Sequence, residues 1–175
     1  MAANWTAFVA GNVLTAAQLN GVVDNFADIA VFNETQANNT DGGTYTSGSY
    51  VKRVLNTTIV NNIAGCSIAT SVVTLPAGTF YIKGTAPCFG VDNANARLQN
   101  TTAATTIRYG QNARSGSGDS TMNSAIVETV VTFTGNTNIE LQFRGNTTKA
   151  NIGLGVPSNF GNDEIYSTLF IARIA

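Results

Sequence analysis

Residues 165–174 read IYSTLFIARI, a run in which β-branched and aromatic side chains predominate. Such a composition predicts a β-strand. Successive side chains of a strand point to opposite faces, and in this run apolar residues fall on both faces. The strand should therefore be buried on two sides. We expect one side to face the core of its own domain and the other to face a neighbouring subunit or a second layer.

Several earlier runs have the same character, and turn sequences such as Pro76-Ala77-Gly78 separate them. The runs span residues 51–60, 67–75, 79–84, 96–100, 105–109, 124–133 and 139–144. In the last of them apolar and polar residues alternate strictly, as in a half-buried strand. About eight strands with no helical period among them predict an all-β fold, a jelly-roll sandwich, for residues 49–175.

The first 48 residues differ from the rest and are expected to form an attachment segment. Residues 15–18, TAAQ, match a capping box, which marks the start of a short N-terminal helix. Apolar side chains then recur on one helical face, at Leu19, Val22, Phe26 and Ile29. A helix of about four turns is marginal alone. We expect this face to pack on its own domain, to dock on another protein, or to form the seam of a trimer.

An apolar cluster and a polar stretch flank the predicted helix. Trp5, Phe8 and Val9 precede it, and aromatic side chains supply much of the energy of protein interfaces, so these three are expected to anchor the chain to a partner. Residues 33–49 contain almost no apolar side chains. This composition predicts an irregular linker, with the boundary between the attachment segment and the jelly roll after residue 48.

The charge content excludes several classes of function. The chain has 9 Lys and Arg residues, 10 Asp and Glu residues and no histidine. Nine scattered cations offer no electrostatic footprint for nucleic acid or an anionic membrane. No apolar run reaches the length of about 18 residues that membrane insertion needs, and the first residues lack the pattern of a secretory signal. Without histidine, a Ser-His-Asp triad and a His-ligated metal are excluded, so we expect neither an enzyme nor a cofactor.

Two sets of polar residues are weak candidates for binding sites. Asp92-Asn93 and Asp163-Glu164 offer oxygen atoms to calcium, although acidic pairs are also common at solvated loop ends. Four arginines form either a basic surface for an anionic glycan or a set of strand-edge and subunit contacts: Arg97, Arg108, Arg114 and Arg144. The sequence alone leaves these alternatives open.

Residues 110–120, GQNARSGSGDS, predict a long polar loop. Loops of this kind often carry function, so Arg114, Ser115 and Asp119 are candidate residues of an exposed binding loop. The alternative is a plain hairpin connection between two strands.

Cys66 and Cys88 are the only cysteines of the chain. We expect two buried, unpaired thiols in a reducing compartment. A disulfide between two strands stays open, because spacing alone does not exclude it.

The low charge also bears on assembly. Nine cations and 10 acids are few for the surface of a monomer of this size, which the scaling with mass puts at about 8,000 Å². Asn and Thr side chains can hydrate the rest of that surface. The alternative, burial by assembly, explains the low charge, the strand with two apolar faces and the apolar helix face together. Closed homo-oligomers are the usual form of such assembly, and we expect a homotrimer with three helices about one axis.

Several segments together resemble a known family. They are VLNT at 54–57, TLPAGTF at 74–80, ANARLQN at 94–100, ELQFR at 140–144 and SNFG at 158–161. In this order they resemble the complement and tumour-necrosis-factor-like jelly-roll domain of phage tail fibres, head fibres and related virion surface proteins. Trp5 and the AGNVLTAAQLN segment at 10–20 resemble the opening of many phage fibre-like proteins. Residues 91–94 depart from the family, which often has basic and histidine residues there, so no ligand contact is carried over.

The resemblance implies a homotrimer, a virion location after assembly in the host bacterial cytoplasm, and a non-enzymatic role. Two functions follow from it. One is a capsid decoration (cement) or head-fibre protein, anchored to the major capsid protein by the N-terminal segment. The alternative is a tail-fibre or needle-tip protein that is attached to a tail protein and binds a host surface glycan. The first is favoured because a single small jelly roll encodes no long shaft.

Deleting residues 1–14 should leave a folded trimer that no longer attaches to the particle. The reason is that Trp5, Phe8 and Val9 are removed from all three subunits at once, and with them the avidity of three linked anchors. Co-sedimentation of the full-length and shortened proteins with particles measures the effect. Attachment that survives the deletion would contradict the anchoring role.

Overall fold

The computed structural model describes residues 28–118 and 121–175 of the chain. These residues form eleven strands: β1 (Ile29–Gln36), β2 (Val51–Lys52), β3 (Thr57–Asn61), β4 (Ser67–Ala69), β5 (Val72–Leu75), β6 (Gly78–Phe89), β7 (Asp92–Asn100), β8 (Thr105–Ser115), β9 (Met122–Phe133), β10 (Thr137–Gly145) and β11 (Glu164–Arg173). The same residues contain no helix, and therefore none that could cross a membrane. The all-β class expected from the sequence is confirmed.

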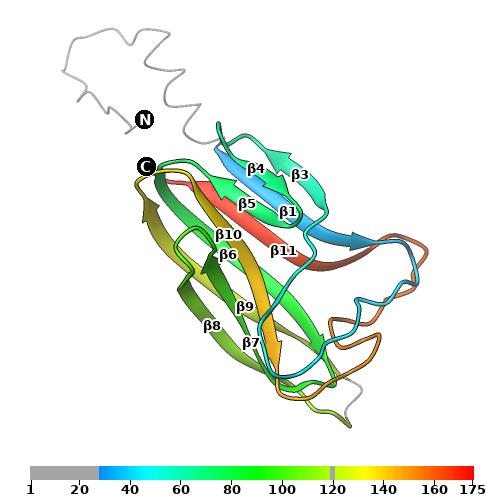
Figure 1. Ribbon diagram of the computed structural model, residues 1–175. Coiled ribbons are helices and arrows are strands. Elements are labelled where there is room, and N and C mark those ends of the chain that lie inside the picture. The colour runs from blue at the N-terminus through cyan, green and yellow to red at the C-terminus, as the bar shows by residue number, and fades with distance from the viewer. Residues whose placement is uncertain (1–27, 119–120) are drawn as a thin grey trace, which may run out of the picture.

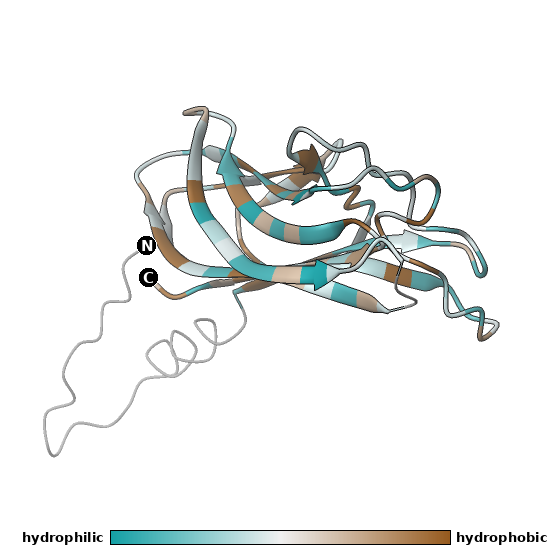
Figure 2. Cartoon of the chain, turned by 90° about the horizontal axis from the view of Figure 1, so that it is seen from below, coloured by the Kyte–Doolittle hydropathy of each residue, from teal (hydrophilic) through white to brown (hydrophobic). Residues whose placement is uncertain are grey.

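The strands form two antiparallel sheets that pack face to face (Figure 1). The first, named the β11 sheet here, has the strand order β3-β1-β11-β6-β9. The second, the β10 sheet, has the order β4-β5-β10-β7-β8, and β2 also pairs with β10. Fully buried side chains from both sheets, such as Leu98 and Leu169, fill the space between them. Bands of brown and teal along the strands in Figure 2 show the alternation of apolar and polar residues that produces this core.

Strand β11 lies in the middle of its sheet, between β1 and β6. Leu169 and Ile171 point into the core and are fully buried. On the opposite face Phe170 is half-buried, and its ring centroid lies 6.3 Å from that of Tyr81 on β6. Within one chain, the prediction of two buried faces is therefore fulfilled for the inner face and only partly for the outer one.

The predicted linker and domain boundary are wrong. Residues 29–36 form β1, which pairs with β11 on one side and β3 on the other, and Phe32 is fully buried. Tyr45 is also in the core, where its hydroxyl donates to the carbonyl oxygen of Gly145 at 2.8 Å. The jelly roll thus includes residues from Ile29 onward instead of beginning at residue 49. The polar composition of this stretch gives no local signal of a strand, because the residues with which it pairs lie far away in the sequence.

Ile29 belongs to a strand, so the predicted helical seam does not extend to it. The other seam positions and the proposed anchor lie outside the described residues: Trp5, Phe8, Val9, Leu19, Val22 and Phe26.

Two of the predicted strands are interrupted. The run 51–60 divides into β2 and β3, because Arg53 turns into the interior between them. The run 67–75 divides into the hairpin of β4 and β5, where Thr70 and Ser71 have φ values of 47° and 63°. Two consecutive residues with positive φ are the mark of a type I′ hairpin turn, usually built from Asn and Gly. Because Asn and Gly are absent here, the sequence does not predict this turn.

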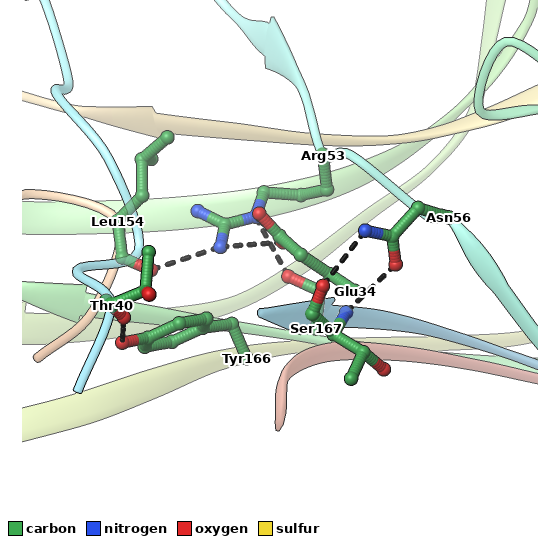
Figure 3. Close-up of polar contacts among 8 residues, drawn as sticks. Glu34, Thr40, Arg53, Asn56, Leu154, Tyr166 and Ser167 are labelled. Atoms are coloured by element: carbon green, nitrogen blue, oxygen red, sulfur yellow. Dashed lines mark hydrogen bonds and ion pairs between the residues drawn. The ribbon is translucent and has the colours of Figure 1, made fainter. Parts of the chain in front are cut away.

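A buried ion pair joins the two sheets (Figure 3). Arg53 follows β2, and its Nη2 lies 2.7 Å from Oε2 of Glu34 on β1, with both side chains shielded from solvent. Its Nε donates to the same oxygen at 2.9 Å and to Oγ of Ser167 on β11 at 2.7 Å. Nη2 also donates to the carbonyl oxygen of Leu154 at 2.9 Å. Burial lowers the pKa of Arg53, and the adjacent Glu34 carboxylate opposes this effect.

Replacing Glu34 by alanine should be strongly destabilising, because it leaves the guanidinium of Arg53 buried without a carboxylate. We expect the free energy of unfolding in urea to fall by about 3–5 kcal/mol. The matched control is Lys52→Met, which removes the partly exposed pair of Lys52 with Glu140 at 3.8 Å and an exposed hydrogen bond to Thr70, and should cost less than about 1 kcal/mol. Equal losses of unfolding free energy in the two variants would show that the buried pair stabilises the fold no more than the exposed one.

Candidate functional site

Polar side chains gather on the outer surface of the β10 sheet, where β10, β7 and β8 are neighbours. The register pairs Arg144 of β10 with Asn95 of β7, and Asn95 with Asn112 of β8. It also pairs Arg97 of β7 with Tyr109 of β8. Paired residues share a face, as do residues two positions apart on one strand. Together with one residue that precedes β2, they form the polar face: Tyr50, Asn95, Arg97, Tyr109, Asn112 and Arg144.

Tyr50 organises the polar face. The guanidinium carbon of Arg97 lies 4.0 Å from the centroid of its ring and that of Arg144 lies 5.8 Å away. The ring centroid of Tyr109 is 6.3 Å from that of Tyr50. The Tyr50 hydroxyl donates to Oδ1 of Asn95 at 3.2 Å, and partial burial raises its pKa. Tyr50 therefore acts as a neutral ring that holds two cations together.

Arg97 is fixed by its neighbours on the sheet. Its Nε donates to Oε1 of Gln142 at 2.8 Å, and its Nη1 donates to Oγ1 of Thr106 at 3.0 Å. Hydrogen bonds from Thr106 and Arg97 lower the pKa of Tyr109. These contacts hold Arg97 in one position, whereas Arg144 contacts only the Tyr50 ring within the described part of the chain.

An open hollow of about 470 Å³ lies at one end of the polar face. Its lining residues are Asn93, Ala94, Asn95, Asn112, Ala113, Arg144 and Asn146. They come from the start of β7, the end of β8, the end of β10 and the residue that follows it. Figure 1 places this end of the sandwich opposite the start of β1 and the C-terminus.

The structure brings together three of the four arginines proposed from the sequence. Arg97 and Arg144 belong to the polar face, and Arg114 pairs with Asn93 on the same side of the sheet. Arg108 pairs with the buried Leu98, so it does not share that face. The sequence analysis missed Tyr50 and Asn95. Nothing in their local sequence marks them as site residues, because the site forms only when strands distant in the sequence pair.

The predicted binding loop at residues 110–120 is mostly strand. Arg114 and Ser115 are the last residues of β8, and Asp119 lies outside the described residues. Ser115 is only 1% exposed, accepts from the amide of Gly90 at 2.8 Å and donates to the carbonyl oxygen of Thr121 at 2.6 Å. It is a structural residue, and the expectation that it is exposed is wrong.

In each of the two residue pairs considered for calcium, one carboxylate has structural partners. Asp92 accepts from the amide of Ser117 at 2.9 Å and from the hydroxyl of Thr147. The buried Glu164 accepts from the amides of Ser158 and Asn159, each at 2.8 Å. In residues 28–118 and 121–175 no three acidic or cysteine side chains are grouped as metal ligands would be. These carboxylates hold loops in place.

Cys66 and Cys88 are free thiols; Cys88 is buried as expected, whereas Cys66 is only half-buried. Burial raises the pKa of each to about 11. Because the thiolate is the reactive form, neither cysteine is a nucleophile at neutral pH.

Comparison with solved structures identifies the fold. Murine APRIL at pH 5.0 matches with a TM-score of 0.55 and 9% identity, over 83% of this chain and 98% of its own. Eiger TNF from S. frugiperda matches with a TM-score of 0.55 and 14% identity, over 84% and 92%. The PRD1 vertex protein P5 matches with a TM-score of 0.51 and 11% identity, over 85% and 98%. At such identities the likeness concerns the fold alone.

The fold is a tumour-necrosis-factor-like jelly roll. This confirms the architecture implied by the resemblance of the sequence. No protein-family model matches the chain. A search of curated proteins also finds no match.

Glu164 should make the loop before β11 sensitive to acid. Its hydrogen bonds lower its pKa from 4.5 to about 2, so its stabilising effect is complete above the unfolded pKa and is lost as pH falls toward 2. We expect the hydrogen-exchange protection of the Ser158 and Asn159 amides to fall between about pH 5 and pH 2. In Glu164→Gln the protection should already be low at pH 7. The control Asp163→Asn, in an exposed neighbour, should behave as the unaltered chain; loss of protection there as well would contradict the assignment.

Proposed function

We propose that the chain is a non-enzymatic structural protein of a bacteriophage virion surface, a homotrimeric capsid decoration or head-fibre protein. In this proposal the N-terminal segment attaches to the particle and the jelly roll stands outward. The observation that carries the proposal is the apolar outer face of the β11 sheet.

A row of apolar side chains crosses four strands of that face. The register pairs Val31 of β1 with Phe170 of β11, and Tyr81 of β6 with Val130 of β9. The contact between the rings of Phe170 and Tyr81 joins the two pairs into one row. Val130 is 58% exposed, and the other three are half-buried. We name Val31, Phe170, Tyr81 and Val130 the apolar row.

Assembly explains the apolar row better than solvent does. A contiguous apolar patch on a monomer marks an interaction site, because its exposure to water is unfavourable. Two charged residues border the row on this face: Lys83, which lies opposite both Phe170 and Glu128 in the strand register, and Glu128, which accepts from the Tyr81 hydroxyl at 3.2 Å. In a cyclic trimer each copy contacts two others, so the rows of three subunits meet near one axis.

Two further observations support the virion as the location. The PRD1 vertex protein P5 has the same fold, although its 11% identity carries no function across by itself. The ordered segments of this sequence, such as TLPAGTF at 74–80, resemble phage fibre domains.

The polar face favours a second candidate, a tail-fibre or needle-tip protein that binds a host surface glycan. The face lies on the β10 sheet, so a trimer formed through the β11 sheet leaves it free. Its hollow is at the end of the sandwich away from Ile29, where the attachment segment joins. An attached subunit would therefore present this end outward.

Counting copies per virion separates the two candidates. Antibodies to the purified protein locate it on virions of the encoding phage by immunogold microscopy, and quantitative mass spectrometry counts it. Scores to hundreds of copies over the shell support decoration, and a handful confined to the tail supports the glycan-binding protein. Absence of the protein from washed particles overturns both.

Replacing Val130 by aspartate should dissociate the trimer. The side chain is largely exposed in one subunit, so the variant should fold, but a charge in the middle of an apolar contact opposes assembly. Sedimentation equilibrium at micromolar concentration should give three times 18.3 kDa for the unaltered chain and a species near 18.3 kDa for the variant. Val54→Asp, at an apolar residue that is 49% exposed and lies between β2 and β3, should remain trimeric. An unaltered chain that sediments as a monomer would contradict the proposal.

A further inference from the structure

We infer that the polar face and its hollow bind an acidic saccharide, a sugar that carries a carboxylate, with Arg144 as the partner of that carboxylate. The inference deepens the second candidate function, on which it rests, by naming the site and the class of ligand.

The hollow is rich in donors that have no internal partner. Within the described residues the Arg144 guanidinium forms neither a hydrogen bond nor an ion pair, and its contact is the Tyr50 ring. The side chains of Asn93 and Asn146, and the amide nitrogen of Asn112, likewise have no hydrogen-bond partner in this part of the chain. Four polar side chains, three on neighbouring strands and one just after β10, are thus available to one ligand.

The donor types match a hydroxylated anion. A sugar hydroxyl both donates and accepts, and an asparagine amide offers both functions in return. The planar guanidinium of arginine binds a carboxylate through two parallel hydrogen bonds. One unpaired arginine among three asparagines therefore fits a ligand with one carboxylate and several hydroxyls.

The charges around the hollow favour the same ligand. Arg97 and Arg114 lie on the same face as Arg144. The acidic residues nearby have partners of their own, since Glu140 pairs with Lys52 and accepts from Gln142, and Asp92 accepts from Ser117 and Thr147. The local potential is thus positive in a chain whose net charge is -1.

The exposed ring of Tyr109 belongs to the polar face but does not line the hollow, and it offers a platform on the same face. Arg97 covers one side of the Tyr50 ring at 4.0 Å, whereas Tyr109 is 58% exposed. A phenol ring has an apolar body and a polar tip, which suits the mixed surface of a pyranose. A volume of about 470 Å³ lies within the range of small-molecule sites.

The polar framework under the hollow is preorganised. The side-chain amide of Asn95 donates to the carbonyl oxygen of Gly110 at 2.8 Å and to Oδ1 of Asn112 at 3.2 Å, while its own Oδ1 accepts from Tyr50. Arg97 is held by Gln142 and Thr106. Ordering these side chains before the ligand arrives reduces the entropic cost of binding. Three such sites on one trimer would bind a multivalent glycan with gain in avidity.

The test uses the full-length protein and a matched pair of probes. Trigalacturonate carries carboxylates, and its methyl ester has the same sugar rings without the charge. Isothermal titration should show binding of the acid and at least about tenfold weaker binding of the ester, the loss expected for one charge-assisted hydrogen-bonded pair. Sialyllactose with lactose as its neutral counterpart, and inorganic phosphate, are titrated in parallel. Binding of either acidic sugar over its neutral counterpart supports the inference. Equal binding of acid and neutral forms, or binding of phosphate alone, overturns it.

Variants locate the site. Arg144→Gln should weaken binding of the acidic probe by about tenfold or more, and Asn146→Ala should weaken binding of both members of a pair. Arg108→Gln, an exposed arginine off the polar face, should leave the affinity unchanged. Equal losses in Arg144→Gln and Arg108→Gln would indicate non-specific attraction and overturn the site.

The oligomeric mass and circular dichroism of each sample are measured before titration. A folded protein of the expected mass that binds no acidic sugar overturns this inference and leaves the virion proposal standing. A monomeric protein that binds the acidic sugar overturns the trimer and leaves the site standing.

Discussion

Arg53 places a permanent positive charge between the two sheets, and much of the surrounding chain is arranged to accommodate it. Its partners come from three segments that are far apart in the sequence: Glu34 on β1, Ser167 on β11 and the carbonyl oxygen of Leu154. A buried charge without such partners would cost several kcal/mol. These contacts tie β1, the segment after β2 and the loop before β11 to one another in the interior.

The two outer faces of the sandwich differ in chemistry, and this difference organises the functional interpretation. The β11 sheet presents an apolar row that Lys83 and Glu128 border on β6 and β9. The β10 sheet presents arginines and asparagines around a tyrosine, several of them unpaired. An apolar face suits permanent contact between subunits, and a polar face with free donors suits a hydrated ligand. Since the faces are on opposite sides of one core, assembly through one leaves the other accessible.

The sequence predicts the elements whose signal is local and misses those that depend on distant partners. Alternation reveals β10, and the two-sided apolar run reveals β11. Strand β1 is missed because its inward Glu34 is compatible with the core only through Arg53. In the same way, the arginines of the candidate site are visible as residue types, but Tyr50 and Asn95 join them only through strand pairing. Ser115 is wrongly predicted to lie in an exposed loop, because a glycine- and serine-rich stretch is typical of loops even where its backbone still pairs with a neighbouring strand.

The site is built on paired strands and not on a flexible loop, and this has a consequence for its evolution. Residues 95 and 97 face outward, whereas Ala96 and Leu98, which follow them in turn, are fully buried. Leu141 and Phe143 of β10 are buried in the same way, and Gln142 and Arg144 follow them on the outward face. Alternation thus separates the residues of the candidate site from those that determine stability. Selection can rewrite the outward set one position at a time without repacking the interior, so related chains can diverge in ligand preference while the scaffold stays the same.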